Sequence, residues 1–468
     1  MKSWLRKPMT EVIAGLARRD LSAEELMVAT LDRIEETASD LVAFTSLREA
    51  DALRADARAA DARIAAGTPR PLEGIPLGVK DLEDAEGLVT TYGSVPFKDN
   101  LALRDSIQVE RLRAAGAIVV GKTNTPEFGY TAISKNLLFG ASRNPWNLDY
   151  TPGGSSGGSS AAIAGGVIAL ATASDGGGSV RIPASITGCF GHKVSYGRIP
   201  HGPSNMWVMG DTSVHGPLTR SVEDAALHMD VVMGPHPLDP NSLPHPGFSY
   251  RSLLDDLPRG LRAAYLPDLG YAVVQSDVAE VVEEAVGVLP ELGIEVEVVS
   301  GGPPEPGSVW GIGGAWETLA RLHSMLPEHE EDFGRSFIGG VKQAANMTAE
   351  QWGAMRTMRA ELNTWCARMF EQYDILLTPT IPYDAPLARG PLTNEVEGRK
   401  QPASNIGSFT MPFNLSWHPA ATVRAGLSKA GLPVGLQIVA SRHRDDRVLQ
   451  VARAFERETD CFAEWPAF

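Results

Sequence analysis

A glycine- and serine-rich stretch, residues 151–183, holds the side chains best suited to covalent chemistry. It contains one cluster around Ser155 and another around Ser179, and the apolar run 161–173 lies between them. Because glycine lacks a Cβ, such clusters let a ligand approach the backbone closely. Flexible linkers share this composition, but linkers are not joined by an apolar run. We therefore interpret the stretch as a functional site.

Lys80 is well placed to activate one of these serines. A serine hydroxyl becomes a nucleophile when a base takes its proton, and a lysine serves as that base only while its amine is neutral. Holding an unperturbed lysine neutral at pH 7 costs about 4–5 kcal/mol, but burial lowers its pKa. Lys80 follows the apolar run 75–79, which reads as a buried strand, although Asp81 beside it would raise the pKa. We expect Lys80 to be the base, with Ser155 relaying the proton from Ser179.

The second cluster also supplies hydrogen-bond donors. Three glycines, 176–178, come directly before Ser179, so no side chain obstructs their backbone N–H groups. Such a row of donors can form an oxyanion hole for a carbonyl under attack. Asp175 and Arg181 flank the loop, and we interpret them as a structural ion pair. Nucleophile, base and oxyanion hole together favour amide cleavage.

Two other patterns match known motifs but lack the surroundings that those motifs need. Residues 116–123 match the phosphate-loop pattern GxxxxGK(S/T), yet a helix precedes the first glycine and a strand fills the loop. Residues 153–157 match the GxSxG nucleophile elbow, but the turn-like residues 147–152 stand where an apolar strand is required. We therefore expect neither nucleotide binding nor a histidine triad, although His418 and His443 follow in a suitable order.

The composition is that of a globular protein: 468 residues, of which 43% are hydrophobic and 21% are charged. A net charge of −15 without a basic run disfavours nucleic acid or an anionic membrane as partner. Three widely spaced cysteines and no Cys/His cluster predict neither zinc nor a disulfide framework. The N-terminus lacks an apolar signal region, and no run reaches transmembrane length, so a cytoplasmic location is expected.

Hydrophobic periodicity predicts strands that alternate with helices, which is typical of an α/β protein with a mostly parallel or mixed sheet. Helices are expected over most of 10–67, with a capping box at 22–25 and a stop at Gly67. Further helices are expected over 106–115, 221–232, 277–289, 310–326, 349–373 and 444–457. Strands are expected over 74–81, 117–120, 168–172, 263–266, 294–299, 375–377 and 434–439.

Motifs along the chain resemble those of the amidase signature family, which uses a Ser–cis-Ser–Lys triad. The main ones are GIPLGVKD around Lys80, PGGSSGGSSAA around Ser155 and SDGGGSVRIPA around Ser179, with the family's spacing of 24 residues between the serines. Others are GKTNTPEFG, RNPWN, GPLTRSVEDAA, DILLTPT and GLPVGLQIV, in the family's order.

The resemblance implies an α/β fold in which helices cover both faces of a large mixed β-sheet. It implies a single domain over 1–468, with N-terminal helices over 1–67 and a core of about 71–233 and 373–454. The weakly matched segment of about 234–372 is expected to face the substrate. No cofactor or metal is expected, and the oligomeric state stays open, with a homodimer as one option.

On the same resemblance, Ser179 is the nucleophile that becomes acylated. Ser155 is the relay serine, preceded by a cis peptide bond at Gly154. Lys80 is the general base and then, through Ser155, the acid for the leaving group. The oxyanion is expected to bind the backbone N–H groups of Gly176, Gly177, Gly178 and Ser179.

The chain departs from the family pattern at three positions. Gly176 stands where a larger residue such as Thr or Ile is usual, and this change is expected to loosen the oxyanion loop without removing a donor. His192 and Val194 stand where Leu and Pro are usual.

Segments flanking the serines are expected to set the specificity. Phe128, Gly129 and Tyr130 are candidates to line the acyl site, and the apolar stretches 203–209 and 409–417 favour apolar or aryl substrates. The latter stretch has no charged residue to hold an amino acid.

Three functions stay open at this point. The first is a stand-alone amidase or aryl acylamidase for small apolar amides, with some esterase activity. The second is a urethanase that prefers carbamates. The third is the glutaminase subunit of a transfer-RNA amidotransferase, which needs a partner chain; the uncharged stretch disfavours it.

Overall fold

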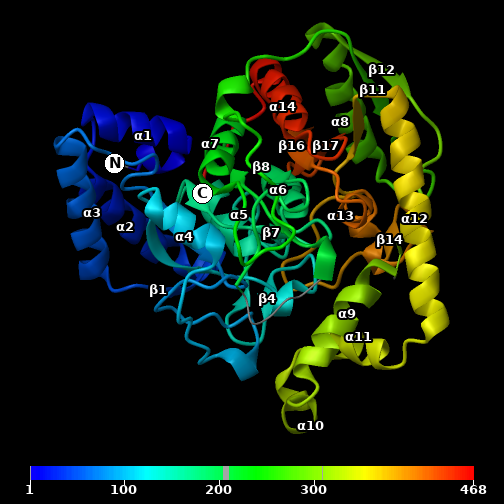
Figure 1. Ribbon diagram of the computed structural model, residues 1–468, viewed down its shortest axis with the longest axis horizontal. Helices are drawn as coiled ribbons and strands as arrows, with labels where there is room; N and C mark the ends of the chain where they lie inside the picture. Colours follow the sequence, from blue (N-terminus) through cyan, green and yellow to red (C-terminus); the bar gives the residue numbers. More distant parts are fainter. Residues whose placement is uncertain (1, 204–209, 308) are drawn as a thin grey trace.

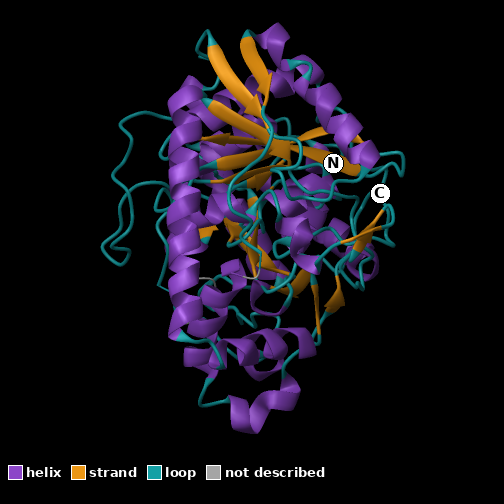
Figure 2. Cartoon of the chain, turned by 90° about the vertical axis from the view of Figure 1, so that its right-hand side faces the viewer, coloured by secondary structure: helices purple, strands orange, loops and turns teal. Residues whose placement is uncertain are grey.

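An eleven-stranded mixed sheet organises the computed structural model, which describes residues 2–203, 210–307 and 309–468. Helices cover both faces of the sheet (Figure 2). Across it the strands run in the order β1 (Phe44–Leu47), β3 (Ile118–Thr123), β2 (Pro76–Lys80), β6 (Leu170–Ala171), β10 (Leu218–Thr219), β8 (Phe190–Lys193), β16 (Ala420–Leu427), β17 (Pro433–Ala440), β13 (Ile375–Pro379), β11 (Leu261–Tyr265) and β12 (Ile294–Val298).

Parallel and antiparallel pairs share the sheet. Strand β2 pairs in parallel with β3 and β6, and β11 pairs in parallel with β12 and β13. The middle strands β10, β8, β16 and β17 are antiparallel to their neighbours. All five residues of β2 are buried, as expected for an inner strand with both faces covered. The predicted mixed α/β architecture is therefore confirmed.

The two faces of β16 and β17 pack against different helices because side chains alternate along a strand. Val423, Leu436 and Ile438 join Val448 of α14 (Asp445–Thr459) in the main core, where α8 (Ser276–Val286) also packs. Gly435 faces the opposite way, where α6 (Arg181–Thr187) packs. Helix α6 follows Ser179 directly, so the sheet anchors the second glycine and serine cluster.

Three N-terminal helices pack together at one end of the molecule (Figure 1): α1 (Met9–Arg18), α2 (Ala23–Leu41) and α3 (Ala50–Ala65). Ser22 and Glu25 form the predicted capping box at the start of α2. Strand β1 lies between α2 and α3 and was not predicted, because only four residues with no clear alternation form it. Its pairing with β3 at the sheet edge stabilises it.

Helices from the weakly matched segment lie at the other side of the molecule (Figure 1): α9 (Val309–Leu322), α10 (Leu326–His329), α11 (Arg335–Ala345) and α12 (Ala349–Gln372). The predicted helix 310–326 ends at Leu322, and α10 begins a separate turn. Phe337 of α11 stacks on Phe128 with ring centroids 4.7 Å apart. This aromatic contact fastens α11 to the core.

The remaining elements are short. The helices are α4 (Ile107–Ala114), α5 (Gly157–Ala164), α7 (Val222–Val232) and α13 (Met411–Leu415). The strands outside the large sheet are β4 (Lys135–Asn136), β5 (Gly140–Ala141), β7 (Ser174–Asp175), β9 (Val214–His215), β14 (Glu395–Val396) and β15 (Arg399–Lys400). Lys122 lies inside β3, which agrees with rejecting the phosphate-loop match. Among the described residues, no helix is long and apolar enough to span a membrane.

Candidate active site

Lys80 ends strand β2 with its amine among serine hydroxyls. Its Nζ lies 2.8 Å from Ser155 Oγ, 2.8 Å from Ser156 Oγ and 2.9 Å from Ser174 Oγ. The side chain is only 1% exposed. The predicted contact between Lys80 and Ser155 is therefore present, and two further serines complete the surroundings of the amine.

Burial sets the charge state of this amine. Removal from water lowers the pKa of Lys80 to about 7, although the carboxylates of Asp175 and Glu83 act to raise it. Asp81 is not among the groups that raise it, because adjacent side chains of a strand point to opposite faces. Asp81 instead lies 3.8 Å from Lys122 Nζ. A large fraction of Lys80 is consequently neutral near pH 7.

Ser155 lies just before α5, and the peptide bond that joins it to Gly154 is cis, as predicted. The carbonyl of Ser155 accepts a hydrogen bond from Thr125 Oγ1 at 2.9 Å. A Cβ placed on Gly129 would lie 3.0 Å from Ser155 Oγ. Glycine at 129 therefore leaves room beside the Ser155 hydroxyl.

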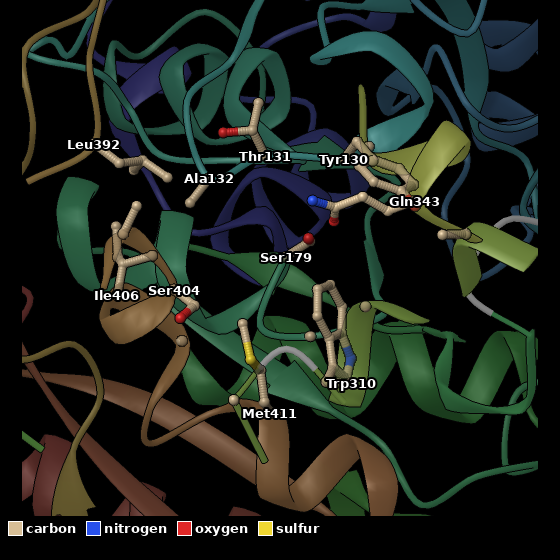
Figure 3. A pocket seen from close by; sticks show the side chains of 18 of the residues that line it. Tyr130, Thr131, Ala132, Ser179, Trp310, Gln343, Leu392, Ser404, Ile406 and Met411 are labelled. Carbon is tan, nitrogen blue, oxygen red and sulfur yellow. The ribbon is translucent and has the colours of Figure 1, made fainter. Parts of the chain in front are cut away.

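Ser179 is half-buried and lies at the wall of a cavity. Figure 3 shows it between Tyr130 and Gln343 on one side and Trp310 and Met411 on the other. In the part of the chain that the structure describes, its Oγ makes no hydrogen bond, so the link from Ser155 is not closed. Hydrogen bonds of this kind often tighten only when a substrate is bound.

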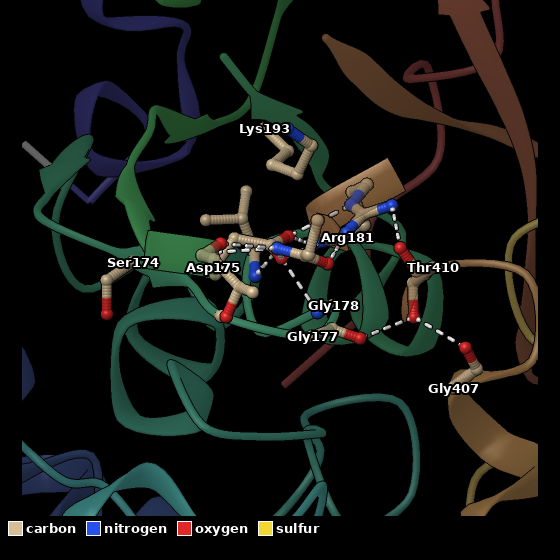
Figure 4. Close-up of polar contacts among 12 residues, drawn as sticks. Ser174, Asp175, Gly177, Gly178, Arg181, Lys193, Gly407 and Thr410 are labelled. Carbon is tan, nitrogen blue, oxygen red and sulfur yellow. Dashed lines mark hydrogen bonds and ion pairs between the residues drawn. The ribbon is translucent and has the colours of Figure 1, made fainter. Parts of the chain in front are cut away.

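The glycine loop before Ser179 has its carbonyl groups fixed by donors from other elements, and Figure 4 shows the contact of Thr410 with Gly177. A planar trans peptide directs its N–H away from its carbonyl, so each contact also orients the following amide. The contacts are Asn414 Nδ2 to Asp175 O at 2.9 Å, Trp310 Nε1 to Gly176 O at 2.8 Å, Thr410 Oγ1 to Gly177 O at 2.7 Å and Ile182 N to Gly178 O at 2.6 Å.

The four predicted oxyanion donors are not equivalent. The N–H of Gly178 donates to Asp175 Oδ1 at 2.7 Å, so this amide is engaged within the loop, contrary to the expectation for it. Among the described residues, the N–H groups of Gly176, Gly177 and Ser179 have no acceptor. These three amides are the candidates that remain for binding an oxyanion.

Asp175 and Arg181 form a fully buried ion pair, with 2.9 Å between Arg181 Nη2 and Asp175 Oδ1. Burial acts to raise the pKa of Asp175, but the Arg181 guanidinium holds it well below its usual range. Arg181 also donates to the side chains of Gln437 and Asn414 at 2.7 and 2.6 Å. The ion pair therefore ties the loop to β17 and α13, in agreement with the structural role predicted for it.

The cavity has a volume of about 700 Å³. Among the described residues that line it, none carries a charged side chain. The larger lining residues are Tyr130, Ile182, Trp310, Gln343, Met347, Gln351, Leu392, Ile406 and Met411. Its chemistry suits an apolar or aromatic group with a few polar contacts.

The sequence predicted some of the residues that line this cavity. Gly129 and Tyr130, which were expected at the acyl site, line the cavity together with Gly177, whereas Phe128 is buried in the aromatic cluster under α11. From the stretch 409–417 Met411 lines the cavity. Residues 204–209 of the other predicted stretch lie outside the described residues.

Several site residues were missed. Trp310 and Gln343 come from α9 and α11, more than a hundred residues after the serines, and nothing in their spacing marks them. Ser156 and Ser174 lie within the recognised motifs PGGSSGGSSAA and SDGGGSVRIPA and could have been included as polar neighbours of the lysine. Within the described ranges, no group of three His, Cys, Asp or Glu residues is arranged to hold a metal ion.

A buried lysine beside serines, a glycine loop and an uncharged cavity on a large mixed sheet define an amide-hydrolysing enzyme. The chain belongs to the Amidase family, whose model matches residues 25–449. It is 36% identical over 461 residues to an acylamidase of Rhodococcus erythropolis, covering 96% of this chain and 94% of that protein.

Two other relatives show the range of the family. One is a component of the glutamyl-tRNA(Gln) amidotransferase of Roseiflexus castenholzii, which is 33% identical over 479 residues, covering 96% of this chain and 95% of that protein. The solved structure of a bacterial aryl acylamidase of the amidase signature family superposes with a TM-score of 0.91 at 30% identity, covering 98% of each chain.

Proposed function

We propose that this protein hydrolyses small apolar or aryl amides through an acyl-enzyme on Ser179. One observation carries the proposal: a buried amine with a pKa of about 7 lies 2.8 Å from Ser155 Oγ. A neutral amine in that position accepts a proton from the hydroxyl without the cost of first deprotonating a charged lysine. The proposal assigns the roles of base, relay and nucleophile to Lys80, Ser155 and Ser179.

The acylation step forms a bond from Ser179 Oγ to the substrate carbonyl carbon. The hydroxyl proton passes to Ser155 Oγ, and the proton of Ser155 passes to Lys80 Nζ. The negative charge that develops on the carbonyl oxygen is stabilised by the N–H groups of Gly176, Gly177 and Ser179. The proton then returns through Ser155 to the leaving nitrogen, the C–N bond breaks, and the amine departs.

Deacylation repeats the same transfers with water as the nucleophile. Water attacks the ester carbonyl and its proton passes through Ser155 to Lys80. The proton is then returned to Ser179 Oγ as the acid leaves. A carbamate would use the same proton transfers with its alcohol as the leaving group in acylation, and water would then release a carbamic acid, which loses carbon dioxide to leave the free amine.

The uncharged cavity supports an apolar or aryl substrate. Taking a charged group out of water without a partner is costly, and the described lining supplies no partner for one. Free glutamine carries both an ammonium and a carboxylate, so the lining disfavours the amidotransferase role. The similarity to acylamidases points in the same direction.

Purified enzyme assayed on an anilide, an aryl carbamate and free glutamine separates the three functions. We expect the anilide to be hydrolysed by the isolated chain, with slower release from the carbamate and none from glutamine. Turnover of glutamine alone, and only after a partner chain is added, would overturn the proposal. Preference for the carbamate would select the urethanase.

The acylated residue is located by a second measurement. Enzyme treated with an aryl sulfonyl fluoride or quenched during turnover of an activated ester is digested and analysed by mass spectrometry. We expect the added mass on the peptide that contains Ser179, and none in Ser179→Ala. A label on another residue would remove the assigned nucleophile.

A further inference from the structure

Trp310 connects the substrate-facing helix α9 to the glycine loop. Its Nε1–H donates to Gly176 O at 2.8 Å, and its ring lines the cavity. We propose that Trp310 is a positioning residue for acyl transfer, which holds the oxyanion loop in its working orientation. This inference rests on the proposed function, because it concerns the same loop and the same nucleophile.

The contact involves both the indole N–H and the ring carbons beside it. A Cβ placed on Gly177 would lie 2.3 Å from Trp310 Cζ2 and 2.6 Å from Cε2. Only glycine therefore allows the ring to lie this close to the loop backbone. The indole restricts the loop by packing on Gly177 and by holding the carbonyl of Gly176.

The direction of one carbonyl decides the direction of one candidate donor. Gly176 O and the N–H of Gly177 belong to the same planar trans peptide, so they point in opposite directions. Rotation of this peptide would turn the N–H of Gly177 toward the indole N–H, where two donors would face each other. Trp310 thus favours the orientation in which Gly177 offers its N–H to the substrate.

A run of three glycines needs such a restraint. Glycine has more backbone freedom than any other residue, and an oxyanion hole is effective only when its donors are fixed before the reaction. Thr410 fixes the next carbonyl along the loop, from the core. Trp310 is the corresponding restraint from the helical segment 309–345, which also forms one wall of the cavity.

The test compares Trp310→Phe, which keeps the packing and removes the donor, with Trp316→Phe on the same helix. The side chain of Trp316 is half exposed, so that change is a matched control. Loss of one neutral hydrogen bond predicts a fall in kcat of about 3- to 10-fold. KM for the anilide should stay within about twofold of wild type because ground-state contacts are kept.

An inhibitor that forms an oxyanion gives an independent reading. Binding of a trifluoromethyl ketone to Trp310→Phe should weaken by the same factor as kcat, while binding of the product carboxylate should not change. Trp310→His keeps a ring donor and is expected to recover part of kcat. Thermal unfolding of all variants shows which of them are folded.

The outcomes separate this inference from the function on which it rests. If Trp310→Phe raises KM alone, or leaves both kcat and ketone affinity unchanged, the positioning role is wrong. If wild-type enzyme is not acylated at Ser179, the proposed function fails whatever the variant does. Equal losses in Trp310→Phe and Trp310→His with KM unchanged would also contradict a role for the donor.

Discussion

At the residue scale, Lys80 gains its reactivity from where strand β2 ends. The strand is buried along its whole length, and the amine is hydrogen-bonded to Ser155, Ser156 and Ser174 rather than to a carboxylate. Hydroxyl partners serve a neutral amine without stabilising its charged form as an ion pair would. Burial of the end of the strand therefore explains the lowered pKa of Lys80, and it also places the amine beside Ser155.

The pH dependence of turnover follows from this pKa. Below about pH 7 Lys80 becomes protonated, so kcat/KM should fall about tenfold per pH unit, and above it a plateau should be reached. The measurement is a pH profile of anilide hydrolysis. Burial also lowers the pKa of Lys193 to about 7, but its amine donates to Val194 O. Lys193→Met should therefore keep the inflection.

Lys80→Ala should lose most activity at every pH. Recovery of turnover by raising the pH alone would contradict the role of a buried base, because the amine that accepts the Ser155 proton would be missing at every pH. Stopped assays between pH 6 and pH 10 on a sample whose fold is verified by circular dichroism give the answer.

The serines are predicted to differ in importance. Ser179→Ala should lower kcat by a factor on the order of 10⁴ or more, since no nucleophile remains, while the fold survives. Ser155→Ala should lower kcat by nearly as much, because the proton path from Ser179 to Lys80 is broken. Ser156→Ala removes a partner of the lysine but no step of the path, so we expect it to keep much more activity. Equal losses for Ser155 and Ser156 would contradict this order.

At the element scale, the glycine loop is held from outside itself. Its carbonyls accept hydrogen bonds from α9 and from the 410–414 segment, and the Asp175–Arg181 pair ties it to α13 and β17. A glycine-rich loop is normally mobile. Here hydrogen bonds from other elements fix the orientation of its peptides.

Removal of the loop's acidic anchor should be costly. Asp175→Asn leaves Arg181 buried without its counter-charge, which predicts a loss of about 3–5 kcal/mol in the free energy of unfolding. Urea denaturation measures it. The control is Asp20→Asn, which breaks an exposed pair with Arg18 and should cost about 1 kcal/mol or less. Similar small losses in both variants would show that the buried pair contributes little.

Elements with a strong local pattern were predictable, and elements formed by long-range contacts were not. The run before Lys80 and the helix behind the Ser22 capping box carry clear periodicity or caps, and both appear in the structure. Strand β1 is four residues long, and the predicted strand 168–172 shrinks to Leu170–Ala171. Their pairing depends on neighbours distant in sequence, so local sequence could not set their limits.

The residues of the candidate site also separate into those that the sequence marks and those that depend on distant contacts. Lys80, Ser155 and Gly129 were found because chemistry and motif spacing mark them. The orientation of the Gly178 amide was not predictable, because it depends on how the Asp175 side chain folds back. Trp310 carries no local signal, since its partner Gly176 lies 134 residues away in sequence.

At the scale of the whole molecule, the cavity lies between the sheet-based core and helices α9 and α11. An aromatic cluster joins the two parts: Phe337 stacks on Phe128, and Tyr130 meets Phe337 edge to face at 5.2 Å. The helices that form one wall are therefore attached through the same short segment that carries Gly129 and Tyr130.

Loss of the contact between Phe337 and Phe128 should destabilise helix α11, which forms part of the cavity wall, more than it destabilises the sheet. Phe337→Ala removes a buried ring and predicts a loss of about 3–5 kcal/mol in the local stability of α11. Hydrogen exchange should quicken across 335–345, with little change in β16 and β17, and KM for the anilide should rise. Trp352→Ala, at an exposed ring of α12, is the control. An equal increase in hydrogen exchange in α11 and in the strands of the sheet would show that α11 does not unfold as a separate unit.

An uncharged wall has a consequence for how this enzyme ranks its substrates. Because the described lining offers no ionic group to select a particular molecule, discrimination within a homologous series should follow the free energy of transfer from water and the volume of the cavity. The logarithm of kcat/KM should then rise linearly with the logarithm of the octanol–water partition coefficient of the acyl group, until the acyl chain exceeds the volume of the cavity. Such an enzyme would discriminate among amides by the hydrophobicity and length of the acyl group. It would therefore select synthetic anilides by the same criteria as natural ones.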